Sequence, residues 1–191
     1  MNAAVFLDRD GVLVEDVDLL ATISQIKILP GVAEALTKLR KANFKLIVVS
    51  NQAIVARGLI TEKAVEEIHS EINRHLAENG VSIDAFYFCP HHPKATLEKY
   101  RVVCECRKPR PGLLFQATRE QQIDLQKSFM VGDRITDVIA GAKAGCRTIL
   151  VQTGQHGAAP IETAEPLDNS IQPDWTCANL REAADWILLQ K

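Results

Sequence analysis

The sequence has no large excess of charge of either sign and few aromatic residues. Its 191 residues carry a net charge of −2, and aromatic side chains make up 5% of them. We therefore expect neither a basic face nor a stacking groove for nucleic acid. No apolar run approaches the roughly 18 residues that a membrane span needs. Asp8 also interrupts the first apolar stretch too early for a signal peptide. These absences predict a cytoplasmic protein without nucleic-acid or membrane partners.

The chain also lacks internal repeats and low-complexity segments, and its number of cysteines is odd. Hydrophobic residues make up 47% of the chain, which is enough for one core, and we expect a single domain over residues 1–191. Five cysteines without a secretory signal do not predict a disulfide framework. Three of them lie near histidines in the sequence, which favours metal binding instead.

Apolar runs that are typical of buried strands alternate with segments of helical spacing. The predicted strands cover residues 3–7, 44–50, 85–88, 128–131 and 147–151. The predicted helices have apolar positions between 32 and 39 and between 65 and 76, and cover 113–121, 137–144 and 180–189. This alternation predicts an α/β fold with three α/β/α layers and a central, mainly parallel sheet. We expect the polar stretch 155–173 to be a surface loop.

Two carboxylates follow the first predicted strand directly, in the sequence Asp8-Arg9-Asp10-Gly11. Acids this close together at the end of a buried strand repel each other unless a cation lies between them. Mg²⁺ prefers such oxygen ligands, and Gly11 allows the backbone to turn away immediately afterwards. The segment therefore indicates a metal site with one carboxylate free to attack a substrate. The alternative is an ordinary surface turn, because Asp and Gly are common turn residues.

Polar residues follow two more of the predicted strands. Ser50 and Asn51 end the second strand, while Asp133 follows the fourth and Asp137 lies one helical turn further on. Because parallel sheets bind ligands beyond the carboxyl ends of their strands, we expect these groups to share one crevice. Lys108 adds a fixed positive charge from a connecting segment. Taken singly, the acids are also explained as helix caps and the lysine as a solvated charge.

A second group of metal-type residues lies between the third predicted strand and Lys108. The expected zinc ligands are Cys89, His91, Cys104 and Cys106. Three thiols and one imidazole fit a tetrahedral structural Zn²⁺ site, whereas buried free cysteines are the alternative. His92 is the other candidate for the imidazole ligand, although the spacing favours His91. Because Cys106 precedes Arg107 and Lys108, a zinc-bound loop would hold both cations over the crevice.

The four chemical segments together carry a resemblance to a known family. They are Asp8-Arg9-Asp10-Gly11, Ser50-Asn51, Lys108-Pro109 and Gly132-Asp133 with Asp137. In order and spacing these resemble the motifs of the haloacid dehalogenase superfamily, whose members are mostly Mg²⁺-dependent phosphotransferases with a Rossmann-like fold. The resemblance covers about residues 3–154. It implies a phosphatase without a large cap domain, because the connections between motifs leave no room for one.

The resemblance also implies a role for each matched residue. Asp8 is the nucleophile that forms an aspartyl-phosphate, and Asp10 is the general acid and then the general base. Mg²⁺ is expected to bind the Asp8 side chain, the Asp10 carbonyl and Asp133, with Asp137 behind these ligands. The side chains expected to stabilise the transferring phosphoryl oxygens are those of Ser50 and Lys108.

The cysteine and histidine residues narrow the resemblance to a capless branch that acts on heptose bisphosphates and on histidinol phosphate. Twelve residues separate His91 from Cys104, a spacing that resembles the heptose enzymes. This implies removal of the 7-phosphate of D-glycero-D-manno-heptose 1,7-bisphosphate, on the route to the lipopolysaccharide core. The alternatives are a phosphatase for histidinol phosphate or another small molecule, a nucleic-acid end phosphatase, and a zinc-stabilised binding module without catalysis. The charge balance disfavours the nucleic-acid enzyme, and the complete set of four motifs disfavours the binding module.

The chain departs from the family pattern where the substrate contacts are expected. The residues implied to contact substrate are Asp16, Asn51, Gln52, Arg107 and Arg134. Arg107 is assigned to the second phosphate, since guanidinium groups suit phosphate oxygens. The departures are Val12, residues 16–20 and residues 53–55. We expect a monomer whose access is controlled by loops 15–27, 89–106 and 155–169.

Overall fold

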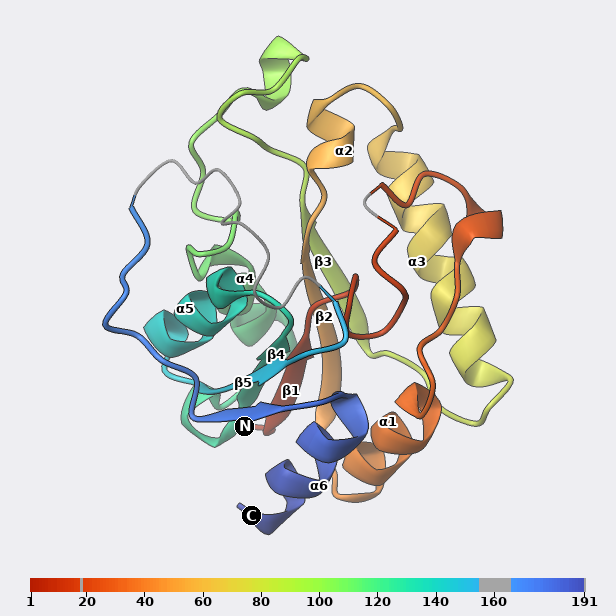
Figure 1. The fold of residues 1–191 in the computed structure, drawn as a ribbon, viewed down its shortest axis with the longest axis vertical. Helices are drawn as coiled ribbons and strands as arrows, with labels where there is room; N and C mark the ends of the chain where they lie inside the picture. Colours follow the sequence, from red (N-terminus) through yellow and green to blue (C-terminus); the bar gives the residue numbers. More distant parts are fainter. Residues whose placement is uncertain (18, 155–165, 191) are drawn as a thin grey trace.

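The computed structural model describes residues 1–17, 19–154 and 166–190, which form three α/β/α layers (Figure 1). The described residues contain one sheet of six parallel strands in the order β3-β2-β1-β4-β5-β6. The strands are β1 (Ala4–Leu7), β2 (Lys45–Asn51), β3 (Ala85–Cys89), β4 (Phe129–Gly132), β5 (Arg147–Val151) and β6 (Trp175–Cys177). The predicted fold class is therefore confirmed, with a sheet that is parallel throughout the described part.

Helices cover both faces of the sheet. One face carries α1 (Val32–Lys41), α3 (Glu62–Ala77) and α6 (Leu180–Leu189), and the other carries α4 (Gly112–Gln121) and α5 (Ile135–Ala144). Val5 and Leu7 of β1 pack into the first core, whereas Ala4 and Phe6 pack into the second. Since side chains alternate along a strand, an unbroken apolar run is what a strand buried on both faces requires.

Local sequence explains where the longest helix begins and ends. The Thr61 hydroxyl accepts a hydrogen bond from the Ala64 amide at 3.1 Å, which caps the first turn of α3. Four apolar side chains at helical spacing, Val65, Ile68, Ile72 and Leu76, are buried on the sheet side. Gly80, with a φ of +77°, lies just beyond the end of the helix, in the left-handed region that glycine adopts most easily.

Two short elements lie where none was predicted. Helix α2 (Ala53–Ala56) follows β2, and strand β6 extends the sheet beyond β5. β6 has only three residues, of which Trp175 and Thr176 are exposed, so no apolar run marks it in the sequence. The described part of the predicted surface loop, residues 166–173, contains no helix or strand, and residues 155–165 lie outside the described ranges.

The segment of residues 89–106, called the zinc loop below, is anchored on α2 and α3. Its Ala95 and Tyr100 pack into a small third apolar cluster with residues of both helices, including Val65. The Tyr100 hydroxyl also donates to the Glu62 carboxylate at 2.6 Å. The described connections β1–α1 and β3–α4 hold only 3-10 turns, Ile23–Gln25 and Glu98–Tyr100. None of the described helices is long and apolar enough to cross a membrane.

Candidate active site

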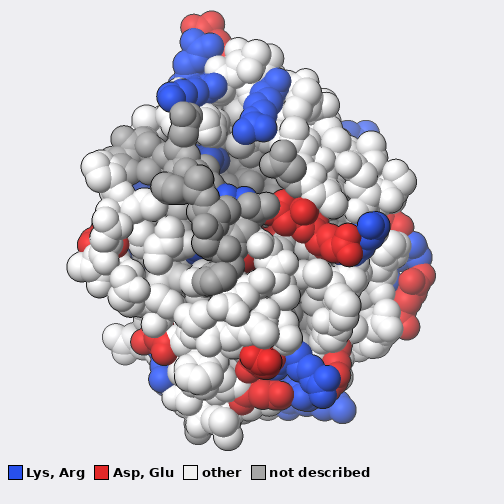
Figure 2. All heavy atoms as spheres, viewed as in Figure 1, with Lys and Arg blue, Asp and Glu red and all other residues white. Residues whose placement is uncertain are grey.

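The polar groups at the strand ends converge on one cleft of about 220 Å³ at the carboxyl edge of the sheet. Figure 2 shows acidic and basic side chains around a hollow in the upper half of this face. The predicted site residues that line the cleft are Asp8, Asp10, Asp16, Ser50, Asn51, Gln52, Arg107, Lys108, Arg134 and Asp137. Arg57 and His92 also line it, and neither was predicted to contact substrate. Arg57 follows the short helix α2, and His92 lies three residues beyond β3, so neither comes directly after a strand.

Three carboxylates form a carboxylate cluster at the base of the site: Asp8, Asp133 and Asp137. One oxygen of each lies within 4.8 Å of the others, and all three residues are buried. Two glycines allow this approach, because a β-carbon on Gly11 or Gly154 would lie 2.6 or 2.4 Å from the Asp133 Oδ2. Asp133 is thus enclosed by backbone, which explains why it lies beneath the cleft and does not line it.

Lys108 is the cation that faces this cluster. Its Nζ lies 3.1 Å from Asp8 Oδ1 and 2.7 Å from Asp137 Oδ1, and it donates to the Val49 carbonyl at 2.7 Å. Burial raises the pKa of Asp8 to about 7, Lys108 opposes this rise, and the neighbouring carboxylates of Asp137, Asp133 and Asp10 add to it. One lysine therefore does not balance the negative charge. A set of hard oxygen donors with excess negative charge fits Mg²⁺.

Asp10 lies on the cleft side of the cluster and is held by two neighbours. Its carboxylate accepts hydrogen bonds from Arg9 Nε at 3.0 Å, Arg9 Nη2 at 2.8 Å and Gln52 Nε2 at 3.1 Å. The Gln52 amide also reaches Ser50 Oγ at 2.7 Å. The contact of Arg9 with Asp10 was not predicted from the sequence. The available signal in the sequence was the position of Arg9, a charged residue close behind the apolar run of a buried strand.

Asn51, a predicted substrate contact, is engaged by the protein itself. Its side-chain amide donates to the Lys108 carbonyl at 3.0 Å, and its Oδ1 accepts from the Lys108 amide at 3.0 Å. This two-way hydrogen bond joins the end of β2 to the segment that carries the buried lysine. The contacts give Asn51 a role in fixing Lys108, although it also lines the cleft.

Asp16 and Arg134, two other predicted substrate contacts, face each other at the rim. Arg134 Nη2 lies 3.4 Å from Asp16 Oδ2, and both side chains line the cleft. The backbone amide of Arg134 also donates a hydrogen bond to Asp137 Oδ2 at 3.0 Å, at the start of α5. The loop after β1 is in this way tied to the loop after β4 across the mouth of the cleft.

The four cysteine and histidine residues predicted to bind zinc lie together and form the cysteine–histidine cluster. The Cys106 Sγ lies 3.1 Å from Cys89 Sγ, 3.2 Å from Cys104 Sγ and 3.4 Å from His91 Nδ1. Ligand atoms of a tetrahedral zinc–thiolate site lie about 3.8 Å apart, so the donors present fit the ion with a small expansion. His92 is outside this cluster: its Nδ1 accepts from the Lys94 amide, and its ring lines the cleft.

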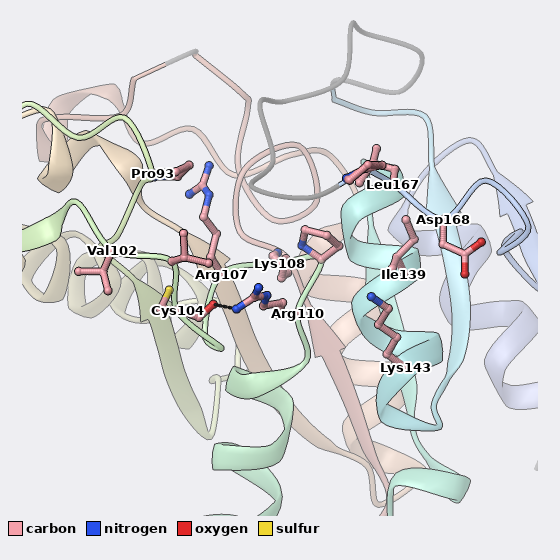
Figure 3. Close-up of a pocket in the computed structure, with 13 residues that line it drawn as sticks. Pro93, Val102, Cys104, Arg107, Lys108, Arg110, Ile139, Lys143, Leu167 and Asp168 are labelled. Carbon is pink, nitrogen blue, oxygen red and sulfur yellow. Dashed lines mark hydrogen bonds between the residues drawn. The ribbon is translucent and has the colours of Figure 1, made fainter.

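The zinc loop leads directly into the cations of the cleft. Arg107 Nη1 donates to the carbonyl of His91 at 3.1 Å, and Arg110 Nη1 donates to the carbonyl of Cys104 at 3.4 Å. Arg107 and Lys108 also line a second, smaller hollow of about 40 Å³ on the side of α5, toward which Lys143 extends (Figure 3). The segment from Arg107 to Arg110 therefore separates the two hollows.

Comparisons with known proteins agree on one family. The HAD-hydrolase-like family matches residues 105–183. The D-glycero-beta-D-manno-heptose-1,7-bisphosphate 7-phosphatase of Salmonella typhi is 38% identical over 98% of this chain and 96% of its own length. The enzyme of the same name from Photorhabdus laumondii is 42% identical over 88% of both chains.

Solved structures give the same result. The D,D-heptose 1,7-bisphosphate phosphatase of B. bronchiseptica, crystallised with magnesium and phosphate, superposes with a TM-score of 0.80 at 32% identity and covers 99% of both chains. A HAD-like phosphatase from Mesorhizobium loti superposes with a TM-score of 0.82 at 27% identity, over 98% of this chain and 85% of its own.

Proposed function

Since the chain belongs to the haloacid-dehalogenase-like hydrolases, in the group of the D-glycero-beta-D-manno-heptose-1,7-bisphosphate 7-phosphatases, we propose that it hydrolyses the 7-phosphate of that sugar. The observation that carries the proposal is the contact of the buried Asp8 with Lys108 at 3.1 Å. Asp10, two residues after Asp8, adds a second carboxylate that lines the cleft. A carboxylate nucleophile next to a cation suits attack on an anionic phosphate ester, which water alone attacks very slowly.

In the first half of the reaction, an oxygen of Asp8 forms a bond to phosphorus while the bond between phosphorus and the C7 oxygen breaks. Asp10 gives its proton to the departing alkoxide, so that the sugar leaves as an alcohol. Ser50 and Lys108 line the cleft, and Lys108 lies next to Asp8. Both would stabilise the phosphoryl oxygens, and Lys108 would offset part of the charge that collects near Asp8. The product of this half is an aspartyl-phosphate on Asp8.

In the second half, Asp10, now ionised, takes a proton from the water that attacks phosphorus. The bond between Asp8 and phosphorus breaks, inorganic phosphate leaves, and both carboxylates return to their initial states. Asp8, Asp133 and the Asp10 carbonyl would hold Mg²⁺, with Asp137 behind them, and the ion would supply charge neutralisation between phosphate and carboxylate. Zn²⁺ in the cysteine–histidine cluster would serve structure only, because all four ligands come from the protein.

The substrate is proposed to bind with its second phosphate toward Arg107 and Arg57. Both guanidinium groups line the cleft, and guanidinium forks bind phosphate oxygens in pairs. We further propose a monomeric, single-domain enzyme that acts in the cytoplasm on this small phosphorylated sugar. The described connections β1–α1 and β3–α4 hold only 3-10 turns, which supports an enzyme of a single domain.

The test is Mg²⁺-dependent phosphate release from the purified protein. The substrates are both anomers of D-glycero-D-manno-heptose 1,7-bisphosphate, histidinol phosphate and fructose 1,6-bisphosphate. We expect a preference for the β anomer with loss of the 7-phosphate only. Faster turnover of histidinol phosphate would overturn the proposed substrate, whereas the proposed catalytic steps would still apply. Asp8→Asn should lower turnover by about 10³-fold or more, and unchanged release by this variant would exclude the covalent route.

A further inference from the structure

We propose that Arg9 is a positioning residue: its guanidinium holds the Asp10 carboxylate by a two-point clamp and so fixes where that carboxylate meets the substrate in the cleft. The inference rests on the proposed phosphatase function, because it concerns the residue that would protonate the leaving group. It assigns a task to a side chain that neither the sequence motifs nor the carboxylate cluster explains.

Arg9 is tied to both carboxylates of the first motif. Its backbone amide donates to Asp8 Oδ1 at 2.7 Å. Its Nε and Nη2 donate to different oxygens of Asp10, Oδ1 at 3.0 Å and Oδ2 at 2.8 Å. This paired geometry is the strong, directional form of an arginine–carboxylate contact. A lysine at this position would supply the charge but not the fork.

The surroundings leave the guanidinium no second ion pair among the described residues. Arg9 is 1% exposed, and its Nη1 is buried with no hydrogen-bond partner in the part of the chain that the structure describes. The nearby His69 is buried and stacks on Phe86 with ring centroids 4.8 Å apart. Because a buried cation is costly without a counter-charge, Asp10 is the group on which Arg9 depends.

The donors on Asp10 show how much of its orientation depends on Arg9. Oδ2 accepts from Arg9 Nη2 and from Gln52 Nε2, whereas Oδ1 accepts from Arg9 Nε. Without the paired contact, Gln52 would be left to hold one oxygen of the carboxylate, which could then turn about that single hydrogen bond.

The test compares two phosphate esters that differ in their need for a proton. An alkyl ester, such as the sugar phosphate that the wild type hydrolyses fastest, needs protonation of its leaving oxygen, whereas 2,4-dinitrophenyl phosphate does not. The parameter is kcat/KM, which reports on steps up to release of the leaving group and excludes hydrolysis of the aspartyl-phosphate. Arg9→Lys is expected to lower kcat/KM about 30- to 100-fold for the alkyl ester and less than 3-fold for the dinitrophenyl ester.

The control is Arg74→Lys, an exposed arginine in ion pairs with Glu71 and Glu78 on α3, which should leave both values unchanged. If Arg9→Lys does not fold, Gln52→Leu removes the second donor to Oδ2 at similar volume. It should show the same selectivity for the alkyl ester with a smaller loss, about 3- to 10-fold. Equal losses for both esters in the folded variant would overturn the clamp. A wild type that hydrolyses neither ester would overturn the proposed function and this inference with it.

Discussion

The carboxylate cluster and the cysteine–histidine cluster are joined by the short run Cys106-Arg107-Lys108, yet they are built in different ways. The carboxylates come from the ends of β1 and β4 and from the first turn of α5, so the sheet fixes them. Of the four cysteine–histidine residues, only Cys89 belongs to a helix or strand, at the end of β3. The first cluster is held by the fold, whereas the second is expected to hold its own loop.

The two clusters also differ in their electrostatics. In the carboxylate cluster burial raises the pKa of Asp8, Lys108 opposes the rise, and the neighbouring carboxylates add to it, so the charged form is disfavoured there. Thiols are neutral when protonated, and the loop that carries them is also held by apolar packing on α2 and α3 and by the hydrogen bond from Tyr100 to Glu62. A metal ion is thus expected to serve activity at one cluster and stability at the other.

The largest effect should come from Asp133→Asn. We expect turnover to fall about 10³-fold because a Mg²⁺ ligand is lost, and this corresponds to about 4 kcal/mol. Stability in Mg²⁺-free buffer should stay within about 1 kcal/mol of wild type or rise, since one of three buried carboxylates becomes neutral. Phosphate release and urea unfolding with and without Mg²⁺ measure both. A large destabilisation without Mg²⁺ would show that the carboxylate cluster also supports the fold.

The opposite pattern is expected for Cys104→Ser. Loss of a thiolate ligand should release zinc and lower the free energy of unfolding by about 3 kcal/mol, because structural zinc contributes directly to folding. Zinc content by mass spectrometry and urea unfolding are the measurements, and a chelator should have no further effect on the variant. Cys146→Ser is the matched control, a buried cysteine outside the cluster whose thiol pKa burial raises to about 12. Equal zinc content in both variants would contradict a site at Cys104.

The smallest effect should come from Asn51→Ala, at the junction between the two clusters. The Lys108 backbone loses both hydrogen bonds to the amide, and we expect kcat to fall about 10-fold with KM nearly unchanged. Steady-state kinetics on the preferred substrate measure this division. A rise in KM at constant kcat would mean instead that Asn51 binds substrate. Asn79→Ala is the control, because Asn79 donates to a backbone carbonyl on the exposed end of α3.

The elements that were predicted share a strong local signal. The strand after Met1, the apolar face of α3 and the whole of α6 are marked by apolar periodicity or capping residues that need no tertiary information. β6 was missed because it has three residues, two of them exposed, and gains its order from pairing with β5. α2 was missed because four residues are too few to show a helical period.

The features of the candidate site likewise divide into those that the sequence predicts and those that depend on the tertiary structure. The candidate metal donors at the strand ends and in the zinc loop can be recognised in the sequence, because carboxylates suit Mg²⁺ and thiols with an imidazole suit Zn²⁺. The contacts that orient them, such as Arg9 on Asp10 and Asn51 on Lys108, depend on which side chains the parallel sheet brings to one edge. By itself the sequence determined the family, the candidate metal donors and the order of the main elements. Only the tertiary structure decided which polar groups are already paired with each other, because pairing over 57 residues of chain is set by packing and not by local preference.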